Sequence, residues 1–558
     1  MKKRVAFIVL IFLILIGIGT ASIFAYQQLY KKGSLKWYQQ KIKVVEADEI
    51  GKGVKTITCG EDCSIYNSNY QKVVDQEVHK LSDKDYSLEN ALWFYNPYGT
   101  NTTSMNVYFT TSDASSIRYK IHVEDETIAD YSNILYNEGE NNLTKYHSYQ
   151  IIGFIPGMEN EVTLEVLDEE EQVVDSETFH FQMPDIKSDV DIKVQVTDGD
   201  STEELTNGLY SVLGHDKNFN SNIYLYDNNG VLRAELPLQS YRTDRILWID
   251  DMMVYNYKKN GFVFVNRLGK IEKTYQIGNY EMHHDFEYDE KENKLLILAS
   301  LKDSGTIEDR IISLDLDTGE VEEVLDMKDY FKEAYESASK VKIKNAYGTD
   351  DIDWIHLNSI DLVGDDLILS SRELSAIIRM NDIYTEPKIE YTIADQTVFE
   401  GTEIESKNYT KVGDFVAQAG QHSVTYIEDD SLEDGEYYLI LYNNNYNTAD
   451  SRPDFDWSAY PGTGTYSEGE KSMYYKYLVN EQDKTFELVD SIDLPYSSIV
   501  SSVEHLDDNI ITSSGKSNCY EEFDQDRNLI RSYHYSAEKY AYRVFKYPFT
   551  NYWFYENE

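Results

Sequence analysis

Cysteine is scarce in this chain, with three residues in 558. A zinc ribbon needs two pairs of cysteines, so this class of metal site is excluded. Cys59 and Cys63 stand close enough in Thr-Cys-Gly-Glu-Asp-Cys-Ser to bridge in an oxidising compartment, which leaves Cys519 single. We therefore predict a local disulfide between Cys59 and Cys63.

Basic residues are also in short supply, because 51 lysines and arginines stand against 99 aspartates and glutamates, a formal net charge of −48. Such a chain would repel a phosphate backbone, so we expect no nucleic-acid partner. The acidic residues are expected to form a solvated surface. An anionic substrate must then be drawn in by a local cluster of cations, which gives weight to an arginine beside histidines.

A long apolar run is present only near the N-terminus. Basic residues at positions 2–4 precede an apolar stretch over residues 5–26, which is long enough to span a bilayer. This charge distribution predicts a cytoplasmic N-terminus and an exported body. We expect residues 1–33 to form a membrane anchor with the remaining chain extracellular. Cleavage after Ala21 or Ala25, which would give a secreted protein, stays open.

The pattern of the remaining chain divides it into three parts. Residues 34–88 are polar and irregular and are expected to form a stalk. In residues 89–187, short runs of alternating apolar and polar residues, such as Met-Asn-Val-Tyr-Phe at 105–109, are separated by clusters of Gly, Asn, Asp and Pro. This alternation predicts a small antiparallel β-sandwich.

Residues 200–558 repeat a unit of two strands joined by a turn, as in Ile-Tyr-Leu-Tyr-Asp-Asn-Asn-Gly at 223–230. The Asn-Gly pair supplies the positive φ that a tight hairpin requires. Short strands at this spacing predict a β-propeller, so the expected fold class is all-β. A stretch of helical composition at 327–339 interrupts the repeat and is expected to form a lid or rim element.

Three histidines lie at positions that a propeller would bring together. His284, His356 and His422 are separated by about seventy residues each, which is about one long blade. Equivalent positions of successive blades converge on the axis, so these side chains are expected to meet there. Arg372 follows the next apolar run after His356, and its planar guanidinium matches tetrahedral oxyanions at any working pH. Each histidine alone is more typical of a surface or core residue; together with Arg372 they indicate a site for a small oxyanion.

Four motifs surround these residues. They are His-His-Asp-Phe at 283–286, Asp-Trp-Ile-His-Leu-Asn-Ser-Ile at 353–360, Ser-Ser-Arg-Glu-Leu-Ser-Ala-Ile at 370–377 and Gln-His at 421–422. Through them the sequence resembles the bacterial arylsulfate sulfotransferases, which move a sulfuryl group between phenols without a nucleotide donor. The resemblance runs from about residue 90 to the C-terminus and includes the family's N-terminal β-sandwich, through Asn-Pro-Tyr-Gly-Thr at 96–100.

The resemblance implies a six-bladed propeller and a ping-pong reaction. His422 would be the nucleophile, would expel a phenol from an aryl sulfate and would hold the group as a sulfohistidine for a second phenol. His356 and Arg372 would bind the sulfuryl oxygens, and His284 would complete the cage. Covalent catalysis of this kind divides one difficult transfer into two easier steps. A neutral His422 is required, so activity should fall as the pH drops below its pKa.

The same resemblance places His283 and Asn358 among the substrate-binding residues, although the sequence does not separate His283 from His284. No cofactor and no metal are expected, and the partners are an aryl sulfate donor and a phenolic acceptor. A homodimer stays open. In the family an Asp-Asn-Gly-Asn turn tends to follow the nucleophile, whereas residues 441–446 here read Leu-Tyr-Asn-Asn-Asn-Tyr, so acceptor selection near that loop stays open.

Other functions fit this sequence less well. A formylglycine sulfatase needs Cys/Ser-x-Pro-x-Arg, and a nucleotide-dependent sulfotransferase needs a glycine-rich phosphate loop after a strand; neither is present. A metal-dependent sulfate ester hydrolase, with Asp285 as a ligand, is disfavoured by an arginine in the same cage. A surface propeller that binds a ligand without catalysis is the remaining alternative.

Overall fold

The computed structural model describes most of the chain. The described residues are 31–215, 221–240, 245–338, 350–446, 449, 451–452, 470–537 and 540–556. The apolar run expected to anchor the protein, residues 5–26, lies outside them. Among the described residues, no helix combines the length and apolar character needed to cross a membrane. The described part is an all-β protein, with a small β-sandwich followed by a six-bladed propeller.

The β-sandwich contains eight strands. They are β1 (Lys43–Glu46), β2 (Lys55–Thr58), β3 (Leu92–Tyr95), β4 (Met105–His122), β5 (Tyr131–Ile134), β6 (Thr144–Ile151), β7 (Glu159–Leu167) and β8 (Val173–Gln182). The pairing of β4 shifts between Thr110 and Ser115, so its first half pairs with β3 and β6 and its second half with β5 and β7. One long strand therefore ties both layers together.

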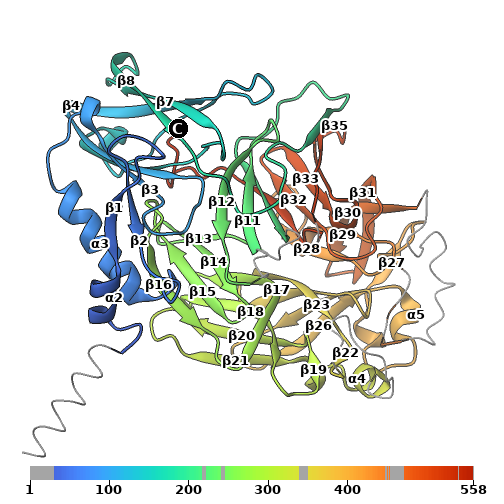
Figure 1. Ribbon diagram of the computed structural model, residues 1–558. Coiled ribbons are helices and arrows are strands. Elements are labelled where there is room, and N and C mark those ends of the chain that lie inside the picture. The colour runs from blue at the N-terminus through green and yellow to red at the C-terminus, as the bar shows by residue number, and fades with distance from the viewer. Residues whose placement is uncertain are drawn as a thin grey trace, which may run out of the picture.

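The segment expected to be a stalk is folded onto this domain. It contains α2 (Leu35–Lys41), the hairpin of β1 and β2, and α3 (Ser68–Ser82), and β2 extends the sheet by pairing in parallel with β3. The physical reason is the spacing of apolar residues in α3, where one face buries Tyr70, Val73, Val74 and Val78. α3 also contacts the propeller, so this segment has a fixed place beside the sandwich (Figure 1).

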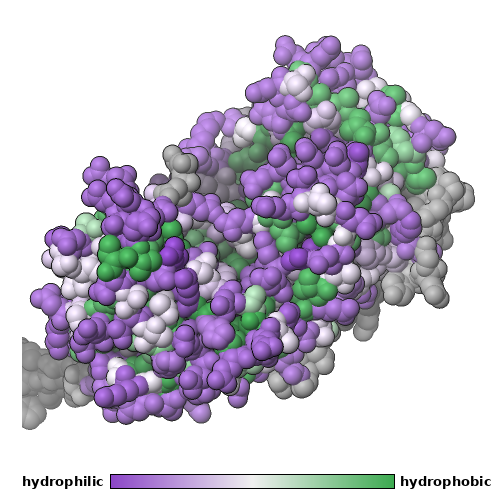
Figure 2. All heavy atoms as spheres, turned by 90° about the horizontal axis from the view of Figure 1, so that it is seen from above, coloured by the Kyte–Doolittle hydropathy of each residue, from purple (hydrophilic) through white to green (hydrophobic). Residues whose placement is uncertain are grey.

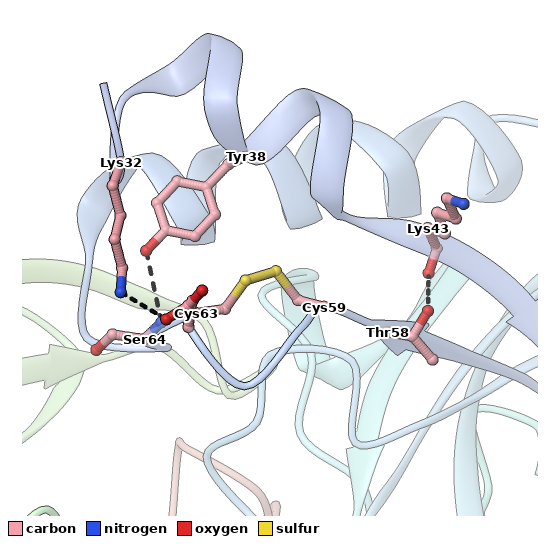
Figure 3. Close-up of a disulfide and its surroundings, with 8 residues drawn as sticks. Lys32, Tyr38, Lys43, Thr58, Cys59, Cys63 and Ser64 are labelled. Atoms are coloured by element: carbon pink, nitrogen blue, oxygen red, sulfur yellow. Dashed lines mark hydrogen bonds and ion pairs between the residues drawn. A yellow bond between two sulfur atoms is a disulfide. The ribbon is translucent and has the colours of Figure 1, made fainter. Parts of the chain in front are cut away.

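A disulfide joins Cys59 and Cys63 in the loop between β2 and α3, where both sulfur atoms face the end of α2 (Figure 3). Nearby, Lys32 and Asp62 form an ion pair of 2.7 Å, and the Ser64 amide lies 3.5 Å from the Tyr38 hydroxyl. The bridge closes a loop of a few residues and is distant in sequence from every motif of the propeller. Its place indicates a structural role for the N-terminal segment.

Six sheets follow, each named here as a blade in chain order (Figure 1). Blade one contains β36 (Val544–Tyr547), β10 (Leu209–His215), β11 (Ser221–Tyr226) and β12 (Leu232–Pro237). Blade two contains β13 (Leu247–Ile249), β14 (Met252–Lys258), β15 (Gly261–Val265) and β16 (Ile271–Gln276). Blade three contains β17 (Tyr280–Asp289), β18 (Lys294–Leu301), β20 (Arg310–Asp315) and β21 (Val321–Asp326). Blade four contains β23 (Leu357–Val363), β24 (Asp366–Ser371), β25 (Ala376–Asn381) and β26 (Lys388–Ile393). Blade five contains β28 (His422–Ile427), β29 (Glu436–Asn443), β30 (Lys471–Asn480), β31 (Thr485–Pro495) and β27 (Thr410–Val412). Blade six contains β32 (Ser502–Leu506), β33 (Asn509–Ser514), β34 (Cys519–Phe523), β35 (Leu529–His534) and β9 (Gln195–Asp198).

The ring is closed by strands from both ends of the propeller segment. β36, near the C-terminus, is the innermost strand of blade one, and β9, at the start, is the outermost strand of blade six. Two strand pairings between distant segments therefore hold the ring shut and leave few free edges. The first strands of blades three to six and β36 contact one another in turn around the axis.

Short elements outside the blades pack beside blades three and four (Figure 1). The predicted helical stretch forms a 3-10 turn, Met327–Asp329, and α4 (Lys332–Ala338), and α5 (Gln396–Phe399) follows blade four. A short parallel pair, β19 (Thr306–Ile307) with β22 (Ile352–Asp353), links blade three to the segment that precedes blade four. This pair determines the position of two acidic residues described below.

The abundant tyrosines pack mainly between the strands. Fully buried examples include Tyr210, Tyr224, Tyr255, Tyr442 and Tyr474, several of which direct the hydroxyl to a hydrogen-bond partner. The surface seen from above is mostly hydrophilic with small hydrophobic areas, as the acidic composition predicts (Figure 2). Tyrosine content is thus explained by packing between strands.

Candidate active site

The predicted histidines meet where the inner strands begin at one end of the axis. His284 lies in β17, His356 directly precedes β23, and His422 is the first residue of β28. In all three strands the pairing register shifts at this place, as in a β-bulge. A bulge redirects side chains that a regular strand would alternate between its two faces.

Left-handed backbone accompanies each bulge. The φ angles are 61° at His284, 50° at His356 and 55° at Ser423, the residue after His422. Such conformations cost about 1–3 kcal/mol for residues other than glycine, and they concentrate at functional sites. The inner strands of three successive blades therefore share one strained feature, and two of the strained residues are predicted site histidines.

His422 is held in one tautomer by its neighbours. Its Nδ1 lies 2.8 Å from Asn444 Oδ1 and 3.1 Å from the carbonyl oxygen of Gly420, both of which only accept hydrogen bonds. Gly420 has a φ of +64°, which a glycine adopts without strain. The backbone amide of Val500 donates to Nε2 at 3.2 Å. The proton is therefore on Nδ1, and the lone pair is on Nε2.

The imidazole of His422 stays neutral. Its side chain is 1% exposed, and burial is the main reason that its pKa lies well below the ordinary value of 6.5. The hydrogen bond that Nδ1 donates to Asn444 Oδ1 opposes this shift, whereas the charges of His356, His284 and Arg372 reinforce it. A buried, neutral imidazole whose Nε2 lone pair accepts a hydrogen bond from a backbone amide has the properties of a nitrogen nucleophile.

His356 has the opposite protonation state. Its Nδ1 lies 2.6 Å from Glu308 Oε2 and 2.7 Å from Asp353 Oδ2. Burial and then Arg372 oppose a charge on the ring, but the two carboxylates outweigh them and raise the pKa of His356 to about 9. Near pH 7 this side chain is therefore an imidazolium.

Arg372 is positioned by a clamp of acidic residues. Its Nη2 lies 2.7 Å from Glu373 Oε1 and 3.3 Å from Asp353 Oδ2, and the backbone amide of Arg372 donates to the carbonyl oxygen of His356. Glu373 in turn accepts hydrogen bonds from the amide and hydroxyl of Ser451. The guanidinium is thereby fixed beside His356 and is 14% exposed, more than the histidines.

Tyr542 connects His284 to His422. The Tyr542 ring stacks on His284 at a centroid distance of 4.5 Å and meets His422 edge-on at 5.9 Å. His284 Nε2 also lies 3.3 Å from Glu308 Oε2, and the His283 ring is 5.1 Å from the His284 ring. His283 and His284 are both buried in the cage. The His284 ring contacts Tyr542, which in turn contacts His422.

Asn358 and Gln421 hold the blades in register at the site. The Asn358 amide donates to the Gln421 carbonyl oxygen at 2.8 Å, and the Gln421 amide donates to Ser370 and to two carbonyl oxygens of blade four. Asn358 was expected to bind substrate. In the structure its side chain is fully buried and directed at the backbone just before His422.

Several residues of the cage carried no sequence signal. Glu308 stands in Thr-Ile-Glu-Asp at 306–309, which matches none of the motifs described above. It reaches the histidines because β19 pairs with β22. Asn444 belongs to the Asn-Asn-Asn stretch where the chain departs from the family motif. Asp285, considered a metal ligand from the sequence, is instead paired with Arg543 at 2.7 and 2.9 Å.

Donor atoms that could hold a metal ion lie in the same cage. Two groups of three residues each offer one atom within 4.8 Å of the others, and Glu308 belongs to both. The groups are His283, His284 and Glu308, and Glu308, Asp353 and His356. The cage therefore joins a neutral imidazole, cations and carboxylates in one place.

A cavity of about 230 Å³ lies beside the Arg372 clamp, between α4 and α5. Its lining is largely apolar, with Phe331, Leu374 and Phe399 as examples, and it includes Arg452. Leu374 is two residues from Arg372, and Arg452 directly follows Ser451 of the clamp. The cavity has the character of a pocket for a small aromatic ring with a polar edge.

Comparison with known proteins gives two family matches. Residues 194–549 match the family model described as Arylsulfotransferase (ASST), and residues 92–184 match the model described as Arylsulfotransferase Ig-like domain. No curated protein matches the chain.

The similarity to solved structures is low. An auxiliary nutrient binding protein from Bacteroides ovatus is 11% identical, with 78% of this chain and 94% of that chain covered and a TM-score of 0.30. The WD40 domain of coronin from Toxoplasma gondii is 10% identical, with 62% and 78% covered and a TM-score of 0.30. Nothing about function follows from likenesses at this level.

Proposed function

The chain belongs to the arylsulfotransferase family, and from this premise we propose that it transfers a sulfuryl group from an aryl sulfate to a phenol by a ping-pong route, without a nucleotide donor. The observation that carries the proposal is the state of His422. This imidazole is buried and neutral, with its proton on Nδ1 and its Nε2 lone pair held by a single backbone amide.

In the first half-reaction, Nε2 of His422 attacks the sulfur of the donor, and the bond between sulfur and the aryl oxygen breaks. The departing oxygen takes a proton from His356, so a neutral phenol leaves. A phenol has a pKa of about 10, close to the value of about 9 for His356. Such a match favours general acid catalysis near neutral pH. Arg372 and His284 hold the remaining sulfuryl oxygens as charge develops on them.

The second half-reaction reverses these steps with a new phenol. The acceptor gives its proton to His356, which restores the imidazolium, and its oxygen attacks the sulfur of the sulfohistidine. The nitrogen–sulfur bond breaks, and the lone pair returns to Nε2 of His422. Asn444 and Gly420 keep the Nδ1 proton in place throughout, so the same nitrogen is used in both halves.

For the aryl ring of the substrate, the cavity beside Arg372 is the proposed site. Phe331 and Phe399 offer apolar surface, and two other lining residues, Leu374 and Arg452, directly follow Glu373 and Ser451 of the clamp in the sequence. A flat ring of a donor or acceptor needs this kind of lining, with a charged group nearby for the sulfate.

The test uses brief exposure of the protein to 4-nitrophenyl sulfate, followed by measurement of intact mass. We expect a mass gain of one sulfuryl group that maps to His422, and faster release of nitrophenol when a second phenol is added. His422→Asn should abolish both the mass gain and turnover. His147→Asn is the matched control, because His147 is also a buried histidine, in the β-sandwich.

Three outcomes would contradict this proposal. A mass gain that persists in His422→Asn would exclude His422 as the nucleophile. Nitrophenol release that ignores the acceptor would indicate a sulfatase. Binding of the aryl sulfate with neither turnover nor mass gain would indicate a ligand-binding propeller.

A further inference from the structure

Three donors of the cage form a compact group that includes His284, one of the residues proposed to hold the sulfuryl oxygens. His283, His284 and Glu308 each offer a ligand atom within 4.8 Å of the others, and all three are buried. The His284 Nε2 and Glu308 Oε2 atoms are 3.3 Å apart. Ligand atoms around a tetrahedral zinc ion lie about 3.3 Å from one another. One edge of such a tetrahedron is therefore already present.

The backbone explains how neighbouring histidines converge. In a regular strand, adjacent side chains point to opposite faces. Here the β17 register shifts between Met282 and Phe286, and His284 has a φ of 61°, so the rings of His283 and His284 come within 5.1 Å of each other. Glu308 also has a left-handed φ, 58°. Two of the three donors are thus held by backbone that the fold must maintain against strain.

The chemistry of the donors selects a class of ion. Two imidazoles and one carboxylate suit zinc and similar divalent transition metals, and three protein ligands leave a position open. The three donor atoms lie within 4.8 Å of one another, and all three residues are buried. A buried carboxylate beside two imidazoles is a donor set for a cation.

The nearby arginine does not oppose this assignment. The guanidinium of Arg372 is engaged by Glu373 at 2.7 Å and by Asp353 at 3.3 Å. Two carboxylates therefore offset its charge, and both lie outside the group of His283, His284 and Glu308. On the sequence alone, an arginine in the same cage disfavours a metal ion. That argument holds for an arginine without an acidic partner, whereas Arg372 is paired with Glu373 and Asp353.

We propose that His283, His284 and Glu308 bind Zn²⁺ or a chemically similar divalent transition metal. In addition, and resting on the proposed function, the metal competes with the aryl sulfate, because His284 cannot hold both the metal and a sulfuryl oxygen. The cage would then have two mutually exclusive occupants, a cation on one side of Glu308 or an anion at Arg372 and His284.

The binding test uses the full-length protein after treatment with a chelator and dialysis. Co²⁺ titration should give visible absorption typical of a low-coordinate site, with saturation at one ion per chain, and Zn²⁺ should displace it. Glu308→Gln and His283→Asn should each weaken binding by at least about 100-fold. Using two variants covers the case in which one of them fails to fold, which circular dichroism detects.

Two controls separate this site from its neighbours. Asp353→Asn removes the other donor group and should retain Co²⁺ binding, and so should His422→Asn, which lacks the nucleophile. Absence of stoichiometric binding to the unmodified protein would overturn the proposal. Binding that persists in both Glu308→Gln and His283→Asn would overturn the assignment of the ligands.

Competition is measured with 4-nitrophenyl sulfate. Zn²⁺ should raise the apparent KM without lowering kcat, and a chelator should restore the original KM. Zn²⁺ that binds but leaves the KM unchanged would overturn the competition. Failure of the transfer function is distinguishable, because a protein that binds Co²⁺ without transferring sulfuryl groups supports the metal site and refutes only the function.

Discussion

Two networks of buried charge in the propeller differ in what surrounds them. The first closes the ring, where Lys546 of blade one meets Glu522 of blade six at 2.8 Å with both side chains fully buried. Neutral groups complete it, since Thr206 donates to Glu522 and Lys546 donates to the Thr206 carbonyl oxygen and to Tyr210. Each charge has an opposite partner, and none of these residues has a positive φ.

The second network is the histidine cage. There one imidazolium, His356, lies between two carboxylates, Glu308 and Asp353, and both His356 and Glu308 have left-handed backbone. Perturbed pKa values alone do not distinguish the two networks, because burial also lowers the pKa of Lys546 to about 8. Structural ion pairs shift pKa values as active sites do. The difference lies in the left-handed backbone of the cage together with a proton that His356 shares with two carboxylates.

The largest effect is expected from a variant that disrupts the charge network closing the ring. Lys546→Met leaves Glu522 buried without its cation, which should cost about 3–5 kcal/mol of unfolding free energy. Thermal and denaturant unfolding measure this loss. Sulfuryl transfer per folded molecule should stay unchanged, because Lys546 lies outside the cage. A stable variant with impaired transfer would contradict the separation of the two networks.

Asp353→Asn tests the opposite case in the cage. In the proposed mechanism, transfer from the donor requires protonated His356. We therefore expect activity of the unmodified protein to be present below a pH of about 9 and to be lost as the pH rises through that value. Removal of one carboxylate lowers the pKa of His356 and shifts the alkaline limb of kcat/KM to lower pH. We expect a decrease in kcat of about 10- to 100-fold with a small change in unfolding free energy.

The control for this variant is Asp365→Asn, an exposed carboxylate paired with Lys291 on the surface. It should leave both the pH profile and kcat unchanged. An alkaline limb that stays in place in Asp353→Asn would remove His356 from the role of proton donor.

Asn444→Asp sharpens the assignment of His422. The pKa of His422 lies well below 6.5, so the unmodified protein loses activity only when the pH falls well below that value. A carboxylate beside Nδ1 favours the imidazolium and raises this pKa, by about one unit or more. The acid limb should therefore move to higher pH. Asn444→Ala, which removes the hydrogen bond without adding charge, should not move the limb upward; an equal upward shift in both variants would contradict the electrostatic explanation.

The smallest expected effect concerns the cavity beside Arg372. Phe399→Ala removes an aromatic surface, which should raise the KM for 4-nitrophenyl sulfate by about 2- to 10-fold with little change in kcat. Steady-state kinetics with phenols of increasing size provide the measurement. Phe415→Ala, a partly buried ring outside the cavity, is the control. An unchanged KM in Phe399→Ala would place the aryl ring elsewhere.

The structure and the sequence agree where local patterns suffice. Alternating strands and Asn-Gly turns indicated an all-β chain, and the structure has a sandwich and six blades. The segment at 34–88 differs from the expected stalk, although Tyr70, Val73, Val74 and Val78 have the spacing of an amphipathic helix. The high polarity of the segment obscured that periodicity, because α3 buries only one narrow face.

The candidate site was only partly predictable for a different reason. The sequence alone shows the motifs that contain His284, His356, Arg372 and His422. Glu308 lies in none of them, and it reaches His284 and His356 only through the pairing of β19 with β22, two strands separated by more than forty residues. The opposite charge states of His356 and His422 were equally hidden, since each depends on partners from other blades.

By itself, the sequence determined the strand pattern, the residue types of the cage and their order along the chain, because these depend on side-chain chemistry and local periodicity. Only the tertiary structure decided which imidazole is neutral, which is charged and which carboxylates they share. Protonation depends on burial and on charges within a few ångströms, and blades distant in the chain supply both.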